Sequence, residues 1–480
     1  MSQVLDDWLA ARARGLPGAE AVVAGGVRLD YRQLDERVHG LAGALVSEGI
    51  QPGDRVALLT LNSLEMVIAL HAIPRAGAIC VPQNLRLTVD DLAFQLRDAG
   101  VSLLLADASH ETWARESAAL AGGVKVAILP LPSIDRGDLC ETHQPGDVHS
   151  IVYTSGTTGA PKGAMLTHGN IFASATGSAF NLGVLPGDRW LACMPLFHVG
   201  GMAIVLRSAV YGTSFVVHEG FDERVVVESL HTERITGVSV VSTMLQRMLE
   251  ADDGQAPPTL RTVLVGGGPV PEALLERAMA RGYPVIQTYG LTEAASQVAT
   301  LAPADALTHI GSAGKPLLNT RLRIDAPVGM PGEILVSGPT VTPGYWSNPE
   351  ATAKAIKDGW LATGDIGRLD GDGFLYVLDR RDDLVVSGGE NVYPAEVEAA
   401  LLAHPSIRAA AVVGLPDERF GQVVAAAVVA TDPIDEQSLR EWLRASLAGY
   451  KLPRRFVWVA ELPMTANGKI QRRLVRSLFD

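Results

Sequence analysis

The sequence predicts an α/β protein in which a mainly parallel sheet is covered by helices, followed by a smaller C-terminal unit. Three observations support this fold class. A chain of 480 residues is too long for one compact core. Helix and strand patterns alternate through its first part, as they do in parallel sheets. After about residue 325 the pattern changes to short strands and turns, and a new helix and strand unit begins beyond them.

The alternation starts with a helix whose apolar residues recur at helical spacing and which Gly49 closes; they are Leu34, Val38, Leu41 and Leu45. Strands are expected at residues 55–60, 79–81 and 101–106, and another helix at residues 64–72. Thr88 is expected to cap a further helix ahead of the third of these strands. The order of these elements favours βαβ units and a parallel sheet.

The same pattern resumes in the middle of the chain. Residues 261–265 form an apolar strand that runs into Gly266, Gly267 and Gly268, and a helix is expected at residues 271–281. Strand ends that are followed by glycine turns are where α/β folds bind ligands. These glycines are therefore candidates for a ligand site.

The last part of the chain forms a separate unit. Short strands are expected at residues 332–336 and 374–377, followed by the charged stretch 379–383. A helix at residues 395–403 and strands at 409–413 and 423–430 come after it. We place the domain boundary in the charged stretch, which gives domains of residues 1–381 and 382–480.

The composition limits the possible functions. Hydrophobic residues make up 47% and charged residues 19%, as in ordinary globular proteins. The net charge of −13 argues against a general nucleic-acid binder. The three cysteines form no CxxC motif, which fits a reducing cytoplasm. No signal peptide and no apolar run of membrane-spanning length is visible, so we expect a soluble cytoplasmic protein.

The most informative segment is a loop rich in glycine and hydroxyl groups at residues 154–163. Glycine lets the backbone approach an anion, backbone N–H groups and hydroxyls donate hydrogen bonds, and a lysine adds charge. The spacing is not that of a Walker loop. The alternative is a flexible connector. The candidate phosphate-binding residues are Thr154, Ser155, Gly156, Thr157, Thr158, Gly159 and Lys162.

This loop resembles the phosphate loop of the adenylate-forming enzymes, which include acyl-CoA synthetases, adenylation domains and luciferases. The resemblance implies a large N-terminal domain of mixed and parallel sheets covered by helices, and a small mobile α+β C-terminal domain. It also implies Mg²⁺ as cofactor and ATP and CoA as co-substrates. Such enzymes convert a carboxylic acid to an acyl-adenylate and then usually transfer the acyl group to a thiol.

A second segment that resembles the family is Tyr289-Gly290-Leu291-Thr292-Glu293. A hydroxyl and a carboxylate at a strand end can bind a phosphate and its Mg²⁺ together. The alternative is a helix N-cap with glutamate in the first turn. The resemblance implies that Thr292 contacts the α-phosphate and that Glu293 holds the metal, with Thr288, Tyr289 and Gly290 beside the nucleotide.

Further nucleotide contacts follow from the resemblance. Asp365, after Thr363-Gly364, would bind the ribose with help from Arg380, although a plain aspartate turn is the alternative. Gly266, Gly267 and Gly268 would line the adenine pocket. His198, in Pro195-Leu196-Phe197-His198, would border the acyl and CoA channels; a lone histidine in an apolar region is more often structural.

The C-terminal domain carries the last matching motif, residues 463–470. The resemblance implies that Lys469 enters the active site for adenylation, where a desolvated ammonium offsets the repulsion between two anions. The alternative is an exposed lysine on an Asn-Gly turn. Asp382 matches the hinge around which this domain rotates, and Gly388 and Gly389 match the loop that faces the CoA tunnel. Asp379 departs from the family, in which many members have glycine there.

Three longer segments most resemble the o-succinylbenzoate–CoA ligases of menaquinone biosynthesis; they are residues 238–245, 289–298 and 311–317. Arg207 agrees with this branch, because it lies in an otherwise apolar segment and a buried guanidinium needs an anion. In this branch the matching arginine is associated with the substrate's second carboxylate. The resemblance places Ser239 near that carboxylate and Gln297 among the substrate-binding residues. Arg207 could instead reach the surface or pair with an internal carboxylate.

Several alternatives remain at the level of sequence. The chain could ligate another aryl or medium-chain acid to CoA, which would leave Arg207 without a purpose. It could load a carrier protein in trans, or bind acyl nucleotides without catalysis. A homo-oligomer is possible. Of these, an AMP-forming ligase for 2-succinylbenzoate is the function that the sequence favours.

Overall fold

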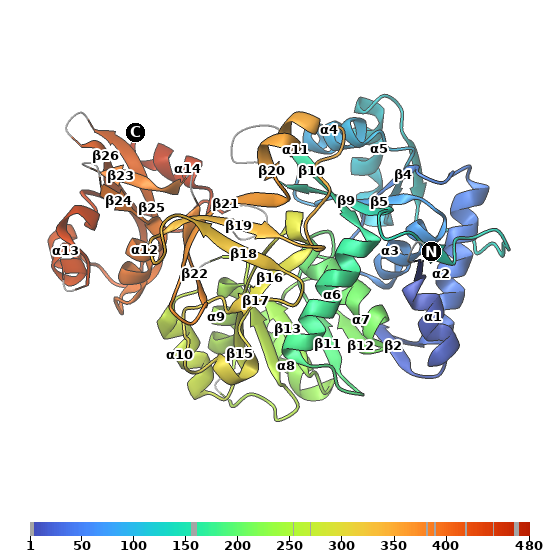
Figure 1. Cartoon of the computed structure of the whole chain (residues 1–480), viewed down its shortest axis with the longest axis horizontal. Helices are drawn as coiled ribbons and strands as arrows, with labels where there is room; N and C mark the ends of the chain where they lie inside the picture. The colour runs from blue at the N-terminus through green and yellow to red at the C-terminus, as the bar shows by residue number, and fades with distance from the viewer. Residues whose placement is uncertain are drawn as a thin grey trace.

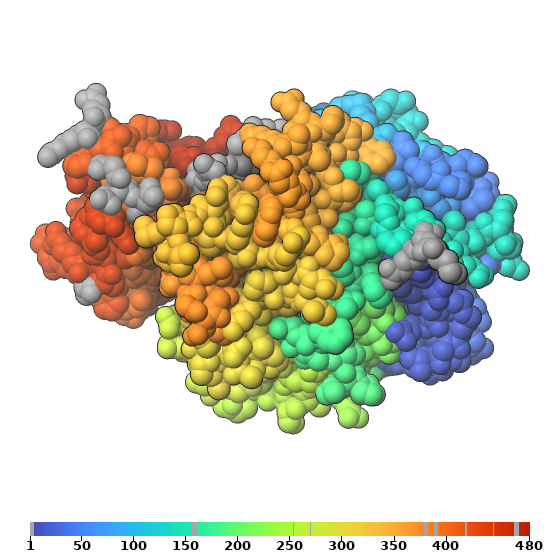
Figure 2. Space-filling view, in the orientation of Figure 1, coloured from blue at the N-terminus to red at the C-terminus, as the bar shows by residue number. Residues whose placement is uncertain are grey.

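The computed structural model describes residues 4–154, 161–252, 254–268, 270–380, 383–387, 390–417, 420–444, 446–464 and 470–480, with backbone only at 379, 380, 390 and 391. The N-terminal segments lie at one end of the longest axis and the C-terminal segments at the other, with the middle of the chain between them (Figure 1). In the space-filling view the C-terminal part protrudes from the larger body (Figure 2). The predicted division into a large and a small unit therefore has a visible counterpart.

The first sheet of the larger body has six strands among the described residues. Its order is β10 (Lys162–Thr167), β9 (Val148–Thr154), β5 (Ile79–Pro82), β4 (Arg55–Leu59), β6 (Leu103–Ala106) and β7 (Lys125–Ile128). Strand β4 pairs in parallel with β5 and β6, whereas β9 and β10 form an antiparallel pair. The helices that accompany it are α2 (Tyr31–Ser47), α3 (Leu64–Arg75), α4 (Val89–Ala99) and α5 (Glu111–Leu120).

The second sheet has nine strands within the described ranges. Its order is β17 (Lys315–Pro316), β16 (Ser296–Thr300), β15 (Val285–Leu291), β14 (Thr262–Val265), β13 (Gly237–Val240), β11 (Arg189–Ala192), β12 (Ser214–Val217), β2 (Glu20–Ala24) and β3 (Val27–Asp30). Its helices are α6 (His168–Leu182), α7 (Val199–Tyr211), α8 (Glu223–Thr232), α9 (Ser242–Ala251) and α10 (Glu272–Ala280). The pairs from β2 through β15 are parallel, and β16 returns antiparallel to β15.

Two smaller sheets follow. One contains β18 (Arg321–Asp325), β19 (Gly332–Ser337), β21 (Trp360–Leu369) and β20 (Ile356–Lys357), with β22 (Leu375–Arg380) on β21 and α11 (Pro349–Ala355) nearby. The C-terminal sheet contains β24 (Glu390–Val392), β23 (Val385–Ser387), β26 (Gly421–Ala430) and β25 (Ile407–Asp417), with β27 (Arg455–Trp458) on β26. Its helices are α12 (Pro394–Leu402), α13 (Glu436–Arg444) and α14 (Arg472–Arg476).

The N-terminal end of the chain joins this body. Helix α1 (Trp8–Gly15) is capped by the side chain of Asp7, and β1 (Leu5–Asp6) pairs with β8 (Thr142–His143). Among the described residues no helix is both long and apolar enough to cross a membrane.

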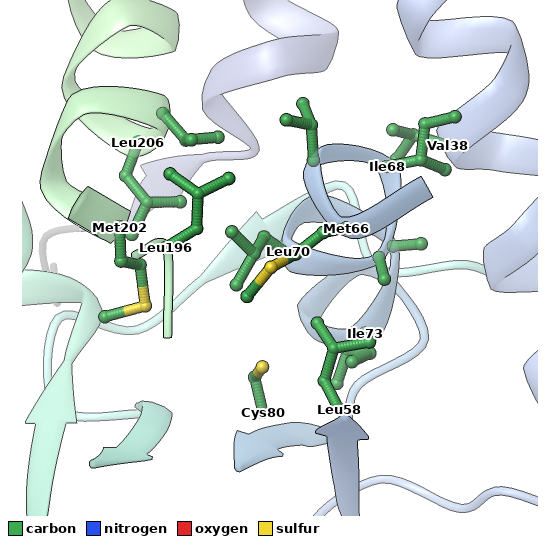
Figure 3. Close-up of a cluster of buried hydrophobic side chains, with 14 of the residues drawn as sticks. Val38, Leu58, Met66, Ile68, Leu70, Ile73, Cys80, Leu196, Met202 and Leu206 are labelled. Carbon is green, nitrogen blue, oxygen red and sulfur yellow. The ribbon is translucent and has the colours of Figure 1, made fainter. Parts of the chain in front are cut away.

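One core connects the first two sheets. Figure 3 shows Met66, Leu70 and Ile73 of α3 together with Cys80 of β5 and Leu58 of β4. Met202 and Leu206 of α7 belong to the same buried cluster, and Leu196 lies beside them (Figure 3). Burial of each such side chain contributes about 1.5–3 kcal/mol relative to exposure, so the two sheets fold as one body. Helix α7, which carries Arg207, packs on β11, β12 and β16 of the second sheet and joins this core.

The predicted elements are present, but several of their boundaries differ from the prediction. Helix α3 does not end at residue 72; it continues through Pro74 to Arg75 and is buried almost all round. Proline lacks an N–H and disfavours a helix interior, but the burial of this helix overrides that local preference. Strand β15 runs on to Leu291, so Tyr289 and Gly290 lie within the strand rather than after it.

Candidate active site

The phosphate loop connects two adjacent antiparallel strands. Thr154 at the end of β9 lies opposite Lys162 at the start of β10. The predicted phosphate contacts Ser155, Gly156, Thr157, Thr158 and Gly159 lie outside the described residues. The strand pair fixes both ends of the loop, and it faces Tyr345 through a bridge between Ala164 and that residue. The two paired strands therefore form a rigid base for this loop.

Glu293 lies beside this base. Its Oε1 atom accepts hydrogen bonds from the Tyr345 hydroxyl at 3.0 Å and from the Thr154 hydroxyl at 3.5 Å. The Lys162 ammonium lies over the Tyr345 ring, 5.4 Å from its centroid. Burial and the nearby Glu293 carboxylate raise the pKa of Tyr345 above its usual value, so its hydroxyl stays protonated and donates. These four side chains, of Thr154, Lys162, Glu293 and Tyr345, thus form one cluster.

The Glu293 carboxylate fits a magnesium ion. Mg²⁺ prefers one or two carboxylate oxygens together with phosphate oxygens and water. While Oε1 is occupied by the two hydroxyls, Oε2 accepts no hydrogen bond from the described residues. The carboxylate is consequently oriented with one oxygen available to a hard cation near the phosphate loop.

Thr292 begins a short 3-10 helix, Thr292–Ala294, and not an α-helix. The residue at the N-cap position is Leu291, whose side chain makes no cap hydrogen bond, so Thr292 is not a helix N-cap. The turn that follows is strained, because Ala295 and Ser296 both have positive φ values of 51° and 93°. It returns the chain antiparallel as β16 and leaves Thr292 and Glu293 at the tip.

Asp365 lies on β21, buried to 8% exposure, and accepts a hydrogen bond from the Tyr289 hydroxyl at 2.7 Å. Strand pairing places Asp365 opposite Arg380 of β22, whose side chain lies outside the description. Gly364 before it has a φ of 75°, which glycine adopts without strain. Tyr289, predicted beside the nucleotide, and Asp365, predicted at the ribose, are thus brought together from positions 76 residues apart in the chain.

Two of the predicted nucleotide-site glycines permit close backbone approach. A Cβ at Gly266 would lie 2.7 Å from Cγ2 of Thr288, and one at Gly290 would lie 1.7 Å from the Ser296 carbonyl oxygen. Gly267 has a φ of 82°, whereas a Cβ at Gly268 would meet nothing within 4 Å. Gly266 and Gly290 require glycine for the packing of β14, β15 and β16, whereas Gly268 faces open space. The Thr288 hydroxyl is bonded to the Ala299 carbonyl at 3.1 Å.

A cavity lies between α6, α7 and the turn after Glu293. Its lining is mostly apolar, with a few polar groups; it includes Ser174, Met202, Leu206, Arg207, Ala295 and Gln297. The Gln297 amide donates to the Thr300 hydroxyl at 3.0 Å. The cavity has the character of a small-molecule site, apolar with a few fixed polar groups.

Arg207 is the charged group of this cavity. It is only 7% exposed, so it does not reach solvent, and no carboxylate in the described part of the chain pairs with it. Its Nη2 atom is buried without a hydrogen-bond partner among the described residues. Burial lowers the pKa of the guanidinium below its usual value, yet arginine remains cationic in proteins. A buried cation in this state attracts an anion.

Ser239 contacts Trp190, which in turn contacts Arg207. Its hydroxyl accepts a hydrogen bond from the indole N–H of Trp190 at 3.3 Å, and the Trp190 ring lies under the Arg207 guanidinium. Trp190 and Arg207 also line a second hollow together with Tyr211. The structure thus brings Arg207, Ser239 and Gln297 into one region, with Ser239 connected to Arg207 through Trp190.

His198 immediately precedes α7 and packs edge-to-face on Phe197, with 4.4 Å between ring centroids. It makes no side-chain cap to the helix. It lies at the start of the helix that carries Arg207, one residue before Val199, which lines the cavity.

In the C-terminal unit, the predicted residues Lys469, Asp382, Gly388 and Gly389 lie outside the described residues. Their surroundings are described. Met464 and Ile470 form a β-bridge across the base of residues 465–469, and the Gln471 side chain donates to the Met464 carbonyl at 2.6 Å. The described residues on either side of Lys469 are therefore held together.

Arg472 anchors this loop. Its guanidinium bonds the buried Glu398 carboxylate, the Val412 carbonyl at 2.7 Å and the Asp383 carboxylate at 3.2 Å. The backbone N–H of Val412 also donates to Glu398 at 2.8 Å. We call Arg472, Glu398 and Asp383 the arginine anchor. It connects the base of the lysine loop to the residue that follows the predicted hinge.

Comparison with protein-family models assigns the chain. The model of the AMP-binding enzyme family matches residues 9–346, and the model of the AMP-binding enzyme C-terminal domain matches residues 396–469. The chain belongs to the AMP-binding enzyme family. The predicted fold class and the resemblance to adenylate-forming enzymes are thereby confirmed.

This AMP-binding enzyme is similar along its whole length to 2-succinylbenzoate–CoA ligases. A 2-succinylbenzoate–CoA ligase of Geobacillus kaustophilus is 47% identical over 488 residues, which cover 99% of this chain and 98% of the relative. The o-succinylbenzoate CoA synthetase of Bacillus subtilis in complex with the acyl-adenylate intermediate superposes with a TM-score of 0.94 at 37% identity, covering 99% and 98% of the two chains.

A second structure of the B. subtilis enzyme, a double mutant bound to a product analogue, superposes with a TM-score of 0.77 at 37% identity, with 99% of each chain covered. Coverage and identity are nearly the same in both superpositions. We infer that the large and small units of this AMP-binding enzyme are arranged as in the acyl-adenylate complex.

Two site residues escaped the sequence reasoning. Tyr345, in Pro343-Gly344-Tyr345-Trp346, contacts Glu293 from 52 positions away, and Trp190 reaches Arg207 from the neighbouring strand. From the sequence alone, aromatic residues at these positions look like ordinary core residues. A glycine before Tyr345 was the one available signal, since glycine turns often precede functional side chains in an AMP-binding enzyme as in other α/β folds.

Proposed function

We propose that this protein is an AMP-forming acid–thiol ligase that joins 2-succinylbenzoate to CoA. The reaction consumes ATP, releases AMP and pyrophosphate, and gives 2-succinylbenzoyl-CoA for menaquinone biosynthesis. Full-length similarity to 2-succinylbenzoate–CoA ligases supports the reaction and the substrate. The acyl-adenylate named in the B. subtilis complex supports the intermediate.

The observation that carries the substrate assignment is the buried Arg207 in a mostly apolar cavity, where no carboxylate of the described residues pairs with it. Leaving a charge buried without a partner is costly, so its ligand should supply an anion. 2-Succinylbenzoate has two carboxylates. One is activated, and the ring carboxylate remains for Arg207. A fatty acid has no second anion to offer.

In the first half-reaction an oxygen of the succinyl carboxylate attacks the α-phosphorus. A new acyl C–O–P bond forms, the bond from the α-phosphorus to the bridging oxygen breaks, and pyrophosphate leaves with that oxygen. Thr292 and the phosphate loop hold the polyphosphate, Asp365 and Arg380 hold the ribose, and Lys469 bridges the two anions. Mg²⁺, held at Glu293, would supply positive charge against the phosphate oxygens.

In the second half-reaction the CoA thiolate attacks the acyl carbon, and AMP leaves with the carboxyl oxygen that it shared. Residues 382–480 rotate about Asp382, and Gly388 and Gly389 come to face the pantetheine chain. His198 borders the two channels. The presence of Asp383 in the arginine anchor supports a boundary between residues 381 and 382.

The test is ATP–pyrophosphate exchange with 2-succinylbenzoate, benzoate, 4-chlorobenzoate, octanoate and palmitate, followed by addition of CoA. We expect exchange with 2-succinylbenzoate alone and its conversion to a thioester by CoA. Exchange with octanoate or benzoate at similar rates would keep the ligase reaction and remove the proposed substrate. Exchange that CoA does not discharge would favour a carrier protein as acceptor.

We also propose a cytoplasmic location. The three cysteines, Cys80, Cys140 and Cys193, are free thiols, and burial raises the pKa of Cys80 and Cys193 to about 12. Free thiols fit a reducing compartment. Fractionation of cells that express the protein tests this, and recovery with the periplasmic or secreted fraction would contradict it.

A further inference from the structure

We propose that Trp190 is a positioning residue that sets substrate specificity: its indole ring holds the Arg207 guanidinium toward the second carboxylate of the acid. The proposal rests on the proposed function and extends it to a residue outside the nucleotide site. It makes the preference for a dicarboxylate a property of a pair of side chains rather than of Arg207 alone.

The contact between the two side chains is close. Cζ of Arg207 lies 4.0 Å from the centroid of the Trp190 ring, the shortest such separation among the arginines of the described residues. Tryptophan is the best aromatic partner for a cation, and the attraction grows when the pair is withdrawn from water. With Arg207 7% exposed, this pair is such a case.

The ring itself is held at two places. Its N–H donates to the Ser239 hydroxyl at 3.3 Å, which fixes the rotation of the indole about its side-chain bonds. Trp190 also lies opposite Gly237 in the pairing of β11 with β13. A Cβ at Gly237 would lie 2.4 Å from Cε3 and 2.5 Å from Cζ3 of the ring, so only glycine leaves room for it there.

The indole ring and a carboxylate would act differently on the charge of Arg207. An aspartate or glutamate in place of the ring would neutralise the guanidinium and occupy its N–H groups. The indole face stabilises the cation without accepting those hydrogen bonds in its plane, and Nη2 remains unbonded by any described residue. Trp190 therefore keeps Arg207 both ordered and available, as selection for an anionic substrate group requires.

This geometry favours an acid that carries a second carboxylate on the part bound in the cavity. The proposed function supplies the rest of the ligand class, an aryl keto acid. The matched probe is 3-benzoylpropionate, which is 2-succinylbenzoate without its ring carboxylate. The ratio of kcat/KM for the two acids measures how strongly the protein selects that carboxylate.

The experiment compares this ratio, by ATP–pyrophosphate exchange, in the wild type and in Trp190→Phe, Trp190→Leu and Arg207→Ala. Phe221→Leu is the matched control, because Phe221 supports Arg247 in a similar contact. Cζ of Arg247 lies 5.1 Å from the centroid of the Phe221 ring, and this pair does not line the cavity. Thermal unfolding of each variant shows whether it is folded.

We expect Trp190→Leu to lower the ratio by about tenfold, because kcat/KM should fall for 2-succinylbenzoate alone. A desolvated cation–π contact is worth roughly that factor or more. The KM for ATP and the kinetics with 3-benzoylpropionate should change little. Trp190→Phe, which retains an aromatic face, should keep most of the selectivity. Phe221→Leu should behave as the wild type.

Equal losses with both acids in Trp190→Leu, or an unchanged ratio, would overturn the proposal and leave Trp190 a packing residue. Failure of the proposed function gives a different result. In that case the wild type itself would not prefer 2-succinylbenzoate, and Arg207→Ala would not change the ratio.

Discussion

Glu293 shows how the site depends on single residues that lie far apart in the chain. Its orientation comes from Thr154 in the first sheet and from Tyr345 in the segment before α11. Both donate to the same oxygen, so the rotamer of the carboxylate is fixed before any cation arrives. A preorganised ligand loses less side-chain entropy on binding.

Tyr345→Phe should therefore weaken the response to Mg²⁺. A hydrogen bond to a charged group contributes about 1.5–3 kcal/mol, so we expect the apparent KM for Mg²⁺ in pyrophosphate exchange to rise by about tenfold or more. The KM for 2-succinylbenzoate should be nearly unchanged. Titration of Mg²⁺ against the thermal unfolding temperature, with ATP present, gives a second readout that does not depend on turnover.

Tyr283→Phe is the control for this prediction, because Tyr283 donates to Asp252 at 3.3 Å away from the nucleotide site. A Mg²⁺ dependence that stays at the wild-type value in Tyr345→Phe would mean that Thr154 alone orients Glu293.

At this scale the sequence identified the charged residues but not their aromatic supports. Glu293, Asp365 and Arg207 could be singled out because their residue types carry chemistry that a core position does not need. Tyr345 and Trp190 could not, since an aromatic side chain is at home in a core and only the fold shows which carboxylate or guanidinium it meets.

Among the elements, the capped helices followed the sequence closely. Thr88 caps α4 with a reciprocal hydrogen bond from Asp91, and Gly100 ends the helix in the left-handed conformation. These signals are local, so they can be read without the fold. The end of α3 could not, because its passage through Pro74 depends on burial by distant segments. Sheet order, likewise, depends on contacts that no local pattern encodes.

The arginine anchor gives a prediction for the C-terminal elements. Arg472→Met should lower the free energy of unfolding of this unit by about 3–5 kcal/mol, because the carboxylate of Glu398, only 6% exposed, would lose its buried partner. Adding Glu398→Gln should recover much of the loss, since the amide oxygen can still accept from Val412. Urea unfolding measures both.

Arg115→Met provides the comparison with a surface pair. Arg115 and Glu111 on α5 are 59% and 43% exposed, and such a pair contributes about 0.3–0.5 kcal/mol. Equal effects of Arg472→Met and Arg115→Met would show that the anchor contributes no more than a surface contact.

The stability of the whole molecule should depend on pH through a histidine cluster formed by His143, His149 and His168 around Trp8. The rings of His143 and His168 stack 3.9 Å apart, and His149 and His168 lie 5.0 Å apart. Burial lowers the pKa of His149 to about 3 and that of His168 to about 2. These side chains are neutral in the folded protein at neutral pH.

Acid should therefore destabilise the fold. The unfolded chain binds a proton at each histidine near pH 6.5, whereas the folded chain does not until the pH is much lower, so stability is complete above pH 6.5 and is lost as the pH falls toward the folded values. Between pH 6.5 and 5 each buried histidine costs about 2 kcal/mol. Calorimetry from pH 7.5 to 5 should show a falling unfolding temperature.

His168→Phe tests the source of that slope, because it retains an aromatic ring beside Trp8 and His143 and removes a titrating group. The fall in unfolding temperature between pH 6.5 and 5 should become shallower. An identical slope in the variant would place the acid sensitivity elsewhere.

The two-step reaction also belongs to the whole molecule. Asp382→Pro, which fixes φ at the predicted hinge, should leave pyrophosphate exchange intact and impair thioester formation from the acyl-adenylate. Lys469→Ala should do the reverse, lowering exchange by about 10²–10³ while supplied acyl-adenylate still reacts with CoA. Rapid-quench measurement of each half-reaction separates them. Two variants with the same defect would contradict the assigned roles.

Because Arg472 bonds Asp383, Glu398 of α12 and the Val412 carbonyl, these segments form one frame next to the predicted hinge. If residues 382–480 rotate as proposed, Lys469 would leave the adenylate together with that frame. The two half-reactions would then be separated by time and not by place. The frequency with which the frame reorients would set a ceiling on turnover that no improvement in substrate affinity could raise.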